Sequence, residues 1–235
     1  MQWTSRTLPG HGQYRPSLVW NEDPEKNLSV AIAPWGSEVD VKKWSDFCVA
    51  ALGGAAGATN SPTEPSEAAS SDPDATQVRA LAAPKRQLQE TPGDLSRVLT
   101  KLNSVILAAE NRSQWSRCAE VALVERKGNQ LRWALAGEFS LLVQTDSGFQ
   151  ILAHQKTLRP RPDSAPLPIL AVGLDSYCSV VSGQAHVEPH QKLILLYSNV
   201  VPVELFAAQD LTLEQVIDLV SAAGPDLPHA IAISD

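Results

Sequence analysis

The segment from residue 118 to residue 153 constrains the fold most, because short apolar runs alternate there with tight turns. A Lys-Gly-Asn turn lies at 127–129 and a Thr-Asp-Ser-Gly turn at 145–148. Apolar runs around turns of this kind are typical of β-hairpins. We therefore expect antiparallel sheets with helices packed outside them. The runs are residues 118–125, 131–136, 139–144 and 149–153.

Helical patterns precede and follow this β-rich segment. Apolar residues recur at three- and four-residue steps in residues 41–52 and again in residues 95–106. The sequence Thr-Leu-Glu-Gln at 212–215 is a capping box that opens a third helix. These elements together predict an α+β layered domain. Further strand-like apolar runs are residues 28–33, 167–172, 192–197 and 230–233.

One internal segment lacks the residues that a core needs. Residues 55–77 consist almost entirely of Ala, Ser, Thr, Pro, Glu and Asp, and Val78 is the first large apolar residue after them. Such a segment cannot bury enough surface to offset its ordering entropy. We interpret residues 55–90 as a disordered loop inside a single domain, residues 1–235. The alternative is a linker between domains, but the part before it is too short for a core of its own.

Composition excludes several functional classes. The formal net charge is −7 and no basic block is present, which argues against nucleic-acid binding. No window approaches the roughly 20 apolar residues of a membrane span, and the first residues do not look like a signal peptide. Three scattered cysteines are typical of reduced core thiols. We expect a cytoplasmic protein, and the Ala- and Pro-rich composition suggests a bacterial one.

Three short motifs, in this order, carry a resemblance to a known family. They are Asn-Glu-Asp at 21–23, Gly-Glu-Phe-Ser at 137–140, and Ser-Asn-Val at 198–200 after an apolar run. Their order and surroundings resemble the metal-dependent Ser/Thr protein phosphatases (type 2C, or PPM type), where these places read Asn-Glu-Asp, Gly-Asp-Ser-Arg and Ser-Asp-Gly. The resemblance implies an antiparallel β-sandwich flanked by helices, in α-β-β-α layers.

The resemblance also implies that most metal-binding side chains are missing. Pro34 and Trp35 stand where the family has a metal-bridging aspartate and a glycine that binds metal through its carbonyl. Asn199 and either Pro228 or His229 replace two further aspartates. A site for two Mg²⁺ or Mn²⁺ ions needs several carboxylates, and Asp23 is the one aspartate left, with Glu22 beside it. We therefore expect no cofactor.

This pattern favours a pseudophosphatase, a catalytically inactive phosphatase-like domain that acts as a protein-binding scaffold or regulator in signalling. The expected partner is a protein, such as a Ser/Thr kinase or a phosphoprotein, and neither nucleic acid nor membrane insertion is expected. Trp20, Trp35 and Asn199 are the candidate partner-binding residues. The alternative for the two tryptophans is that they fill space left by absent ions and waters.

A divergent but active metal-dependent phosphatase is the second hypothesis. Its metal would be Mg²⁺ or Mn²⁺ on relocated ligands. Asp23 would be its essential catalytic residue, and Arg15 would hold the substrate phosphate as in the family. Each residue also has a structural interpretation: Asp226 as a turn residue, His229 as a strand residue, and Asp23 as a cap of the following turn. A third hypothesis is an unrelated α+β module. The candidate metal ligands are Asp23, Glu22, Asn199, His229 and Asp226.

Overall fold

The structure is a computed structural model of the 235-residue chain, and it describes residues 2–8, 16–53, 94–108, 114–156, 167–198, 200–224 and 229–234. The segment predicted to be a disordered loop, residues 55–90, lies outside the described residues. No helix in the described part of the chain is long and apolar enough to cross a membrane.

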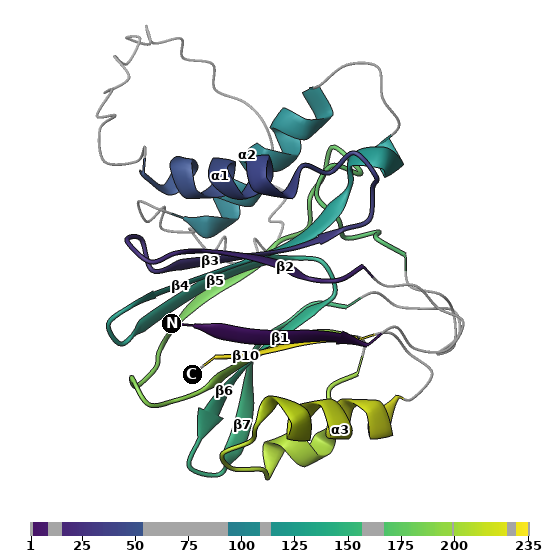
Figure 1. Cartoon of the computed structure of the whole chain (residues 1–235). Helices are drawn as coiled ribbons and strands as arrows, with labels where there is room; N and C mark the ends of the chain where they lie inside the picture. Colours follow the sequence, from purple (N-terminus) through teal and green to yellow (C-terminus); the bar gives the residue numbers. More distant parts are fainter. Residues whose placement is uncertain are drawn as a thin grey trace, which may run out of the picture.

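Two five-stranded sheets form the centre of the molecule (Figure 1). Neighbouring strands pair antiparallel throughout both sheets. Sheet A has the order β1 (Trp3–Leu8), β10 (His229–Ser234), β9 (Leu193–Tyr197), β6 (Phe139–Thr145) and β7 (Gly148–His154). Sheet B has the order β2 (Val19–Asp23), β3 (Leu28–Pro34), β4 (Ala119–Lys127), β5 (Gln130–Ala136) and β8 (Val181–His186).

Helices cover the outer face of each sheet. Helices α1 (Val41–Gly53) and α2 (Leu95–Ala108) pack on sheet B, and α3 (Leu213–Ala223) packs on sheet A (Figure 1). Two short 3₁₀ helices, η2 (Gln114–Arg117) and η3 (Val203–Phe206), complete the elements. The predicted α-β-β-α layering and the α+β class are confirmed.

Alternation along the strands divides the core into three layers. In β4, Ala122 and Val124 face the space between the sheets, whereas Val121 and Leu123 face α1 and α2. This two-residue period matches a strand that is covered on both faces, and it explains why β4 appears as one continuous apolar run in the sequence. The third layer lies between sheet A and α3.

Most predicted elements lie close to their expected positions, and the differences concern polar strands. Helix α1 begins at the predicted residue, α2 contains the predicted apolar stripe and begins at Leu95, and Thr212 and Gln215 form both hydrogen bonds of the predicted capping box. The predicted run 167–172 is not a strand, because only an isolated bridge joins Val172 to Ala119. Strands β1, β2 and β8 were missed, since all three are edge strands with mostly polar residues.

The three cysteines are reduced thiols, as predicted. Cys48 and Cys118 are fully buried, and Cys178 is half-buried. Burial raises the pKa of the Cys48 thiol to about 12 and the pKa of the Cys118 and Cys178 thiols to about 11. Thiols with such pKa values are poor nucleophiles at neutral pH.

Candidate functional site

One end of the β-sandwich brings together the segments that the sequence singled out. Strand β3 ends at Pro34, which pairs with Ala119 at the start of β4. Phe139 at the start of β6 pairs with Tyr197 at the end of β9. Residues 137–138 connect β5 of sheet B to β6 of sheet A at this same end. We call this region the crossover end.

Trp35 enters the interior at the crossover end. Its backbone N–H donates to the carbonyl of Cys118 at 3.1 Å, which fixes the chain just after β3. Its indole Nε1–H lies 3.0 Å from Oε2 of Glu120 and 2.9 Å from the hydroxyl of Tyr197. Trp35 follows β3 and Glu120 lies near the start of β4, and both strands belong to sheet B. Tyr197 ends β9 of sheet A, so these contacts join the two sheets.

Glu120 is the centre of this hydrogen-bond network. Only 1% of its surface is exposed. Its Oε2 accepts from Trp35 and from the hydroxyl of Tyr197, and its Oε1 accepts from the backbone N–H of Glu138 at 3.1 Å. A carboxylate removed from water is costly unless hydrogen bonds compensate it. Three donors on both oxygens supply that compensation. We call Trp35, Glu120 and Tyr197 the cross-sheet triad.

Gly137 allows the chain to pass close to the triad. Its φ angle is +138°, a conformation that favours glycine, and a Cβ there would lie 2.4 Å from the Cβ of Glu120. Its N–H donates to Oε1 of Gln155 at 3.2 Å, and Nε2 of Gln155 donates to the carbonyl of Ser179 at 3.1 Å. The backbone conformation and the close approach of Glu120 therefore favour glycine at position 137.

A second buried carboxyl group accompanies Glu120. Glu138 is also 1% exposed, and it occupies the place that the family resemblance assigns to the aspartate of Gly-Asp-Ser-Arg. The crossover end thus keeps two buried carboxyl groups, one from β4 and one from the β5–β6 connection. Within the described part of the chain, no group of three or more His, Cys, Asp and Glu side chains could hold a metal ion.

The structure places Asp23 far from the crossover end. Asp23 pairs with Leu28 beside the β2–β3 turn, whereas Pro34 lies six residues further along β3, roughly 20 Å away at the usual strand rise. Oδ1 of Asp23 accepts from the N–H groups of Glu25 at 3.0 Å and Lys26 at 3.1 Å. Asp23 therefore caps the turn, as its structural interpretation predicted, and it does not meet Trp35.

The neighbouring motif residues also make structural contacts. Oε1 of Glu22 accepts from the backbone N–H of Trp3 at 3.2 Å. Trp20 is half-buried and stacks on Trp3 with ring centroids 4.9 Å apart. Trp20 pairs with Ala31, four residues before Trp35 in the sequence, and both tryptophans are half-buried.

The side chains of four predicted site residues lie outside the part of the chain that the structure describes. Arg15, Asn199 and Asp226 lie outside the described residues. His229 begins β10, where its backbone pairs with Leu8 of β1, but its side chain is not described. Their proposed roles as phosphate, metal or partner ligands stay predictions.

Sequence reasoning missed Glu120, Tyr197 and Gln155. Glu120 could have been found, because it lies two and four residues before Ala122 and Val124 and therefore on the same face of β4. That face points into the core between the two sheets. Tyr197 ends an apolar run, and its hydroxyl needs a partner when buried. Gln155 follows β7 in a segment with no distinctive pattern, so no sequence signal pointed to it.

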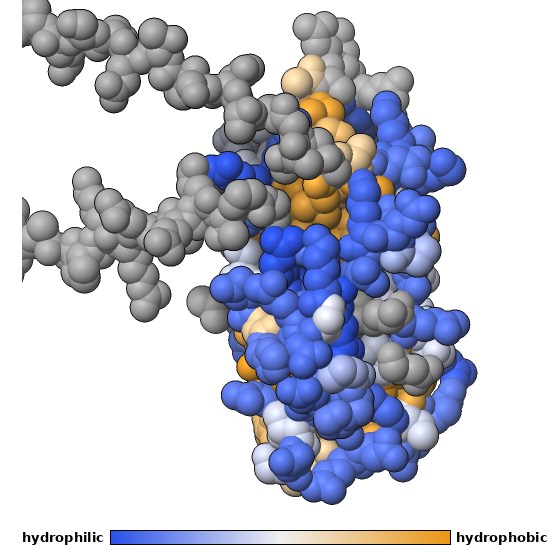
Figure 2. Space-filling model, turned by 90° about the vertical axis from the view of Figure 1, so that its left-hand side faces the viewer, coloured by the Kyte–Doolittle hydropathy of each residue, from blue (hydrophilic) through white to orange (hydrophobic). Residues whose placement is uncertain are grey.

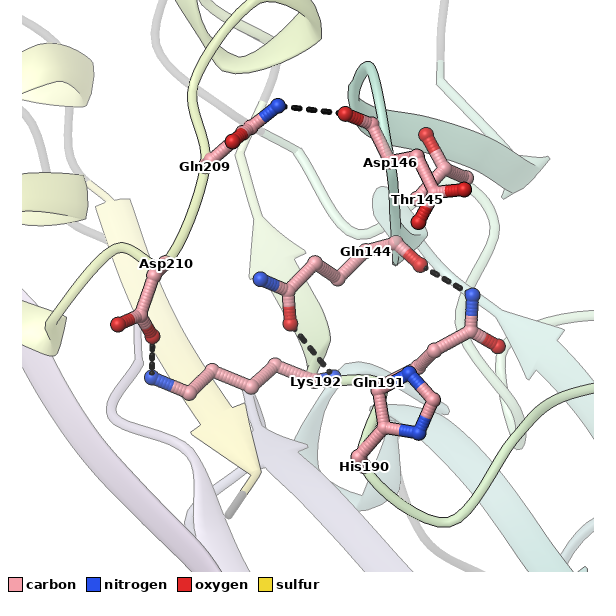
Figure 3. Close-up of a pocket in the computed structure, with 8 residues that line it drawn as sticks. All are labelled: Gln144, Thr145, Asp146, His190, Gln191, Lys192, Gln209 and Asp210. Carbon is pink, nitrogen blue, oxygen red and sulfur yellow. Dashed lines mark hydrogen bonds and ion pairs between the residues drawn. The ribbon is translucent and has the colours of Figure 1, made fainter.

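A polar surface pocket lies at the opposite end of sheet A from the crossover end (Figure 3). Its volume is about 350 Å³. Nζ of Lys192 lies 2.6 Å from Oδ1 of Asp210, and Nε2 of Gln191 donates to the carbonyl of Gln144 at 2.7 Å. These polar groups bind one another across three connecting segments, which is typical of a hydrogen-bonded turn junction. The lining residues are Gln144, Thr145, Asp146, His190, Gln191, Lys192, Gln209 and Asp210.

Comparison with known proteins identifies the fold. No protein-family model matches the sequence, and no curated protein matches it either. Among solved structures, the catalytic domain of the Ser/Thr protein phosphatase PstP with two manganese ions is similar with a TM-score of 0.57 at 15% identity, covering 99% of this chain and 97% of that one.

Two further structures give the same result. The Ser/Thr phosphatase of S. agalactiae has a TM-score of 0.58 at 13% identity, covering 99% of this chain and 98% of its own. PppA, a key regulatory component of T6SS in Pseudomonas aeruginosa, has a TM-score of 0.54 at 14% identity, covering 99% and 96%. Over nearly its full length, the chain therefore has the fold of the PPM-type Ser/Thr phosphatases.

Proposed function

We propose that this protein is a pseudophosphatase: a PPM-type phosphatase-like domain without catalytic activity that acts as a protein-binding scaffold or regulator. The observation that carries the proposal is the cross-sheet triad. Trp35 stands where the family resemblance expects a metal-binding glycine, and its indole N–H binds the buried carboxylate of Glu120. This contact supports the proposal, because it uses an oxygen of a buried carboxyl group at the crossover end for a hydrogen bond with a side chain.

The chemistry of the donor set supports this proposal. Mg²⁺ and Mn²⁺ prefer several oxygen ligands, and two such ions need carboxylates to offset about four positive charges. Pro34 offers no side-chain ligand, and both oxygens of Glu120 already accept hydrogen bonds. Asp23 lies at the other end of the β2–β3 hairpin. The described residues therefore do not fit a two-metal centre.

The proposed partner is a Ser/Thr kinase or a phosphoprotein. Support comes from the fold, since solved proteins that share it include Ser/Thr protein phosphatases and PppA, a regulatory component. Trp35 is half-buried, so part of this residue is accessible at the crossover end. We keep Trp35, Trp20 and Asn199 as the candidate contact residues, with Trp35 the one closest to the triad.

A divergent active phosphatase is the second candidate, and the pair of buried carboxyl groups favours it. Glu120 and Glu138 lie at the same end of the sandwich and both are 1% exposed. A rearrangement of both Trp35 and Tyr197 would release Oε2 of Glu120 for a Mg²⁺ or Mn²⁺ ion. In this candidate Glu138 is the essential ligand, and Asp23 is not.

Calorimetric titration of Mn²⁺ and Mg²⁺, with turnover of a generic aryl phosphate measured in parallel, separates the two candidates. The pseudophosphatase gives neither saturable heat nor turnover. The active enzyme gives both, and both are lost in Glu138→Gln while they persist in Asp23→Asn, the matched control at the far end of the hairpin. Metal binding without turnover would leave the scaffold role standing and would refute the account of the donor set.

A further inference from the structure

We draw no further inference here: the strongest candidate, the apolar patch over helices α1 and α2 (Figure 2), carries none because nothing in the described part of the chain shows what covers it.

Discussion

At the residue scale, Trp35 shows how one side chain can join the two sheets of the sandwich. The sequence identified Trp35 as a replacement in a metal loop, but it could not reveal the orientation of the indole. The structure turns its N–H toward Glu120 and Tyr197. A large aromatic side chain with one polar atom can fill a cavity and satisfy a buried carboxylate at the same time.

Replacing Trp35 with phenylalanine removes this donor and should destabilise the protein. Trp133→Phe is the matched control, because the buried indole N–H of Trp133 has no acceptor among the described residues. Both variants lose the same atoms, so the hydrogen bond to a charged group should make the Trp35 variant worse by about 1–3 kcal/mol. Urea unfolding measures the difference. Equal losses would show that the triad contributes packing alone.

Asp23 is expected to act on stability rather than on chemistry. Its carboxylate accepts two backbone N–H groups in the β2–β3 turn. Asp23→Ala should therefore cost about 1 kcal/mol of unfolding free energy, and Asp23→Asn should recover most of it because an amide oxygen can cap the same turn. Chemical denaturation checks both variants. A loss of metal binding or turnover in Asp23→Asn would contradict this assignment.

His154 should make stability depend on pH. Its Nδ1 lies 2.6 Å from the hydroxyl of buried Ser140, and burial, with a smaller effect of Lys156, lowers the pKa of the imidazole. A lowered folded-state pKa means that the unfolded chain binds the proton more readily. The contribution is therefore complete above about pH 6.5 and is lost as pH falls toward the folded-state pKa.

Unfolding free energies of the wild type and of His154→Gln, measured from about pH 7.5 to about pH 5.5, test this expectation. The wild type should lose more stability than the variant over this interval. Parallel curves would mean that His154 titrates with the same pKa in the folded and unfolded chain.

At the element scale, the sequence predicted covered elements better than exposed ones. Helix α2 was found because its apolar stripe faces sheet B, and β4 because both of its faces are buried. Strands β1, β2 and β8 were missed because an edge strand with a solvent-exposed face lacks a clear apolar pattern. The triad was missed for a related reason: it depends on which strand ends meet, and sequence spacing within one strand does not contain that information.

The capping box at the start of helix α3 should stabilise the protein. Oγ1 of Thr212 accepts from the N–H of Gln215, and the side chain of Gln215 accepts in return from the N–H of Thr212. Thr212→Ala should cost about 1 kcal/mol, whereas Thr212→Ser should keep the cap. Thermal unfolding of the two variants shows whether the capping box acts as described, and a Ser variant as weak as the Ala variant would argue against it.

At the scale of the whole molecule, the fold persists where sequence identity is low. Solved phosphatases at 13–15% identity match this chain over 99% of its length. The order of strands and helices is therefore more durable than the residues that carry out catalysis, because layered packing needs only apolar residues with the right period. A metal centre needs particular carboxylates at particular strand ends, and the family resemblance matches Pro34 to one such aspartate.

The most direct test of this account is a crystal structure from crystals grown with excess Mn²⁺, with anomalous scattering recorded at the manganese edge. We expect the indole of Trp35 to stay hydrogen-bonded to Glu120 and no anomalous peak at the crossover end. A peak coordinated by Glu120 or Glu138, with Trp35 turned away, would contradict the account and would mean that this fold has rebuilt its metal centre from relocated carboxylates.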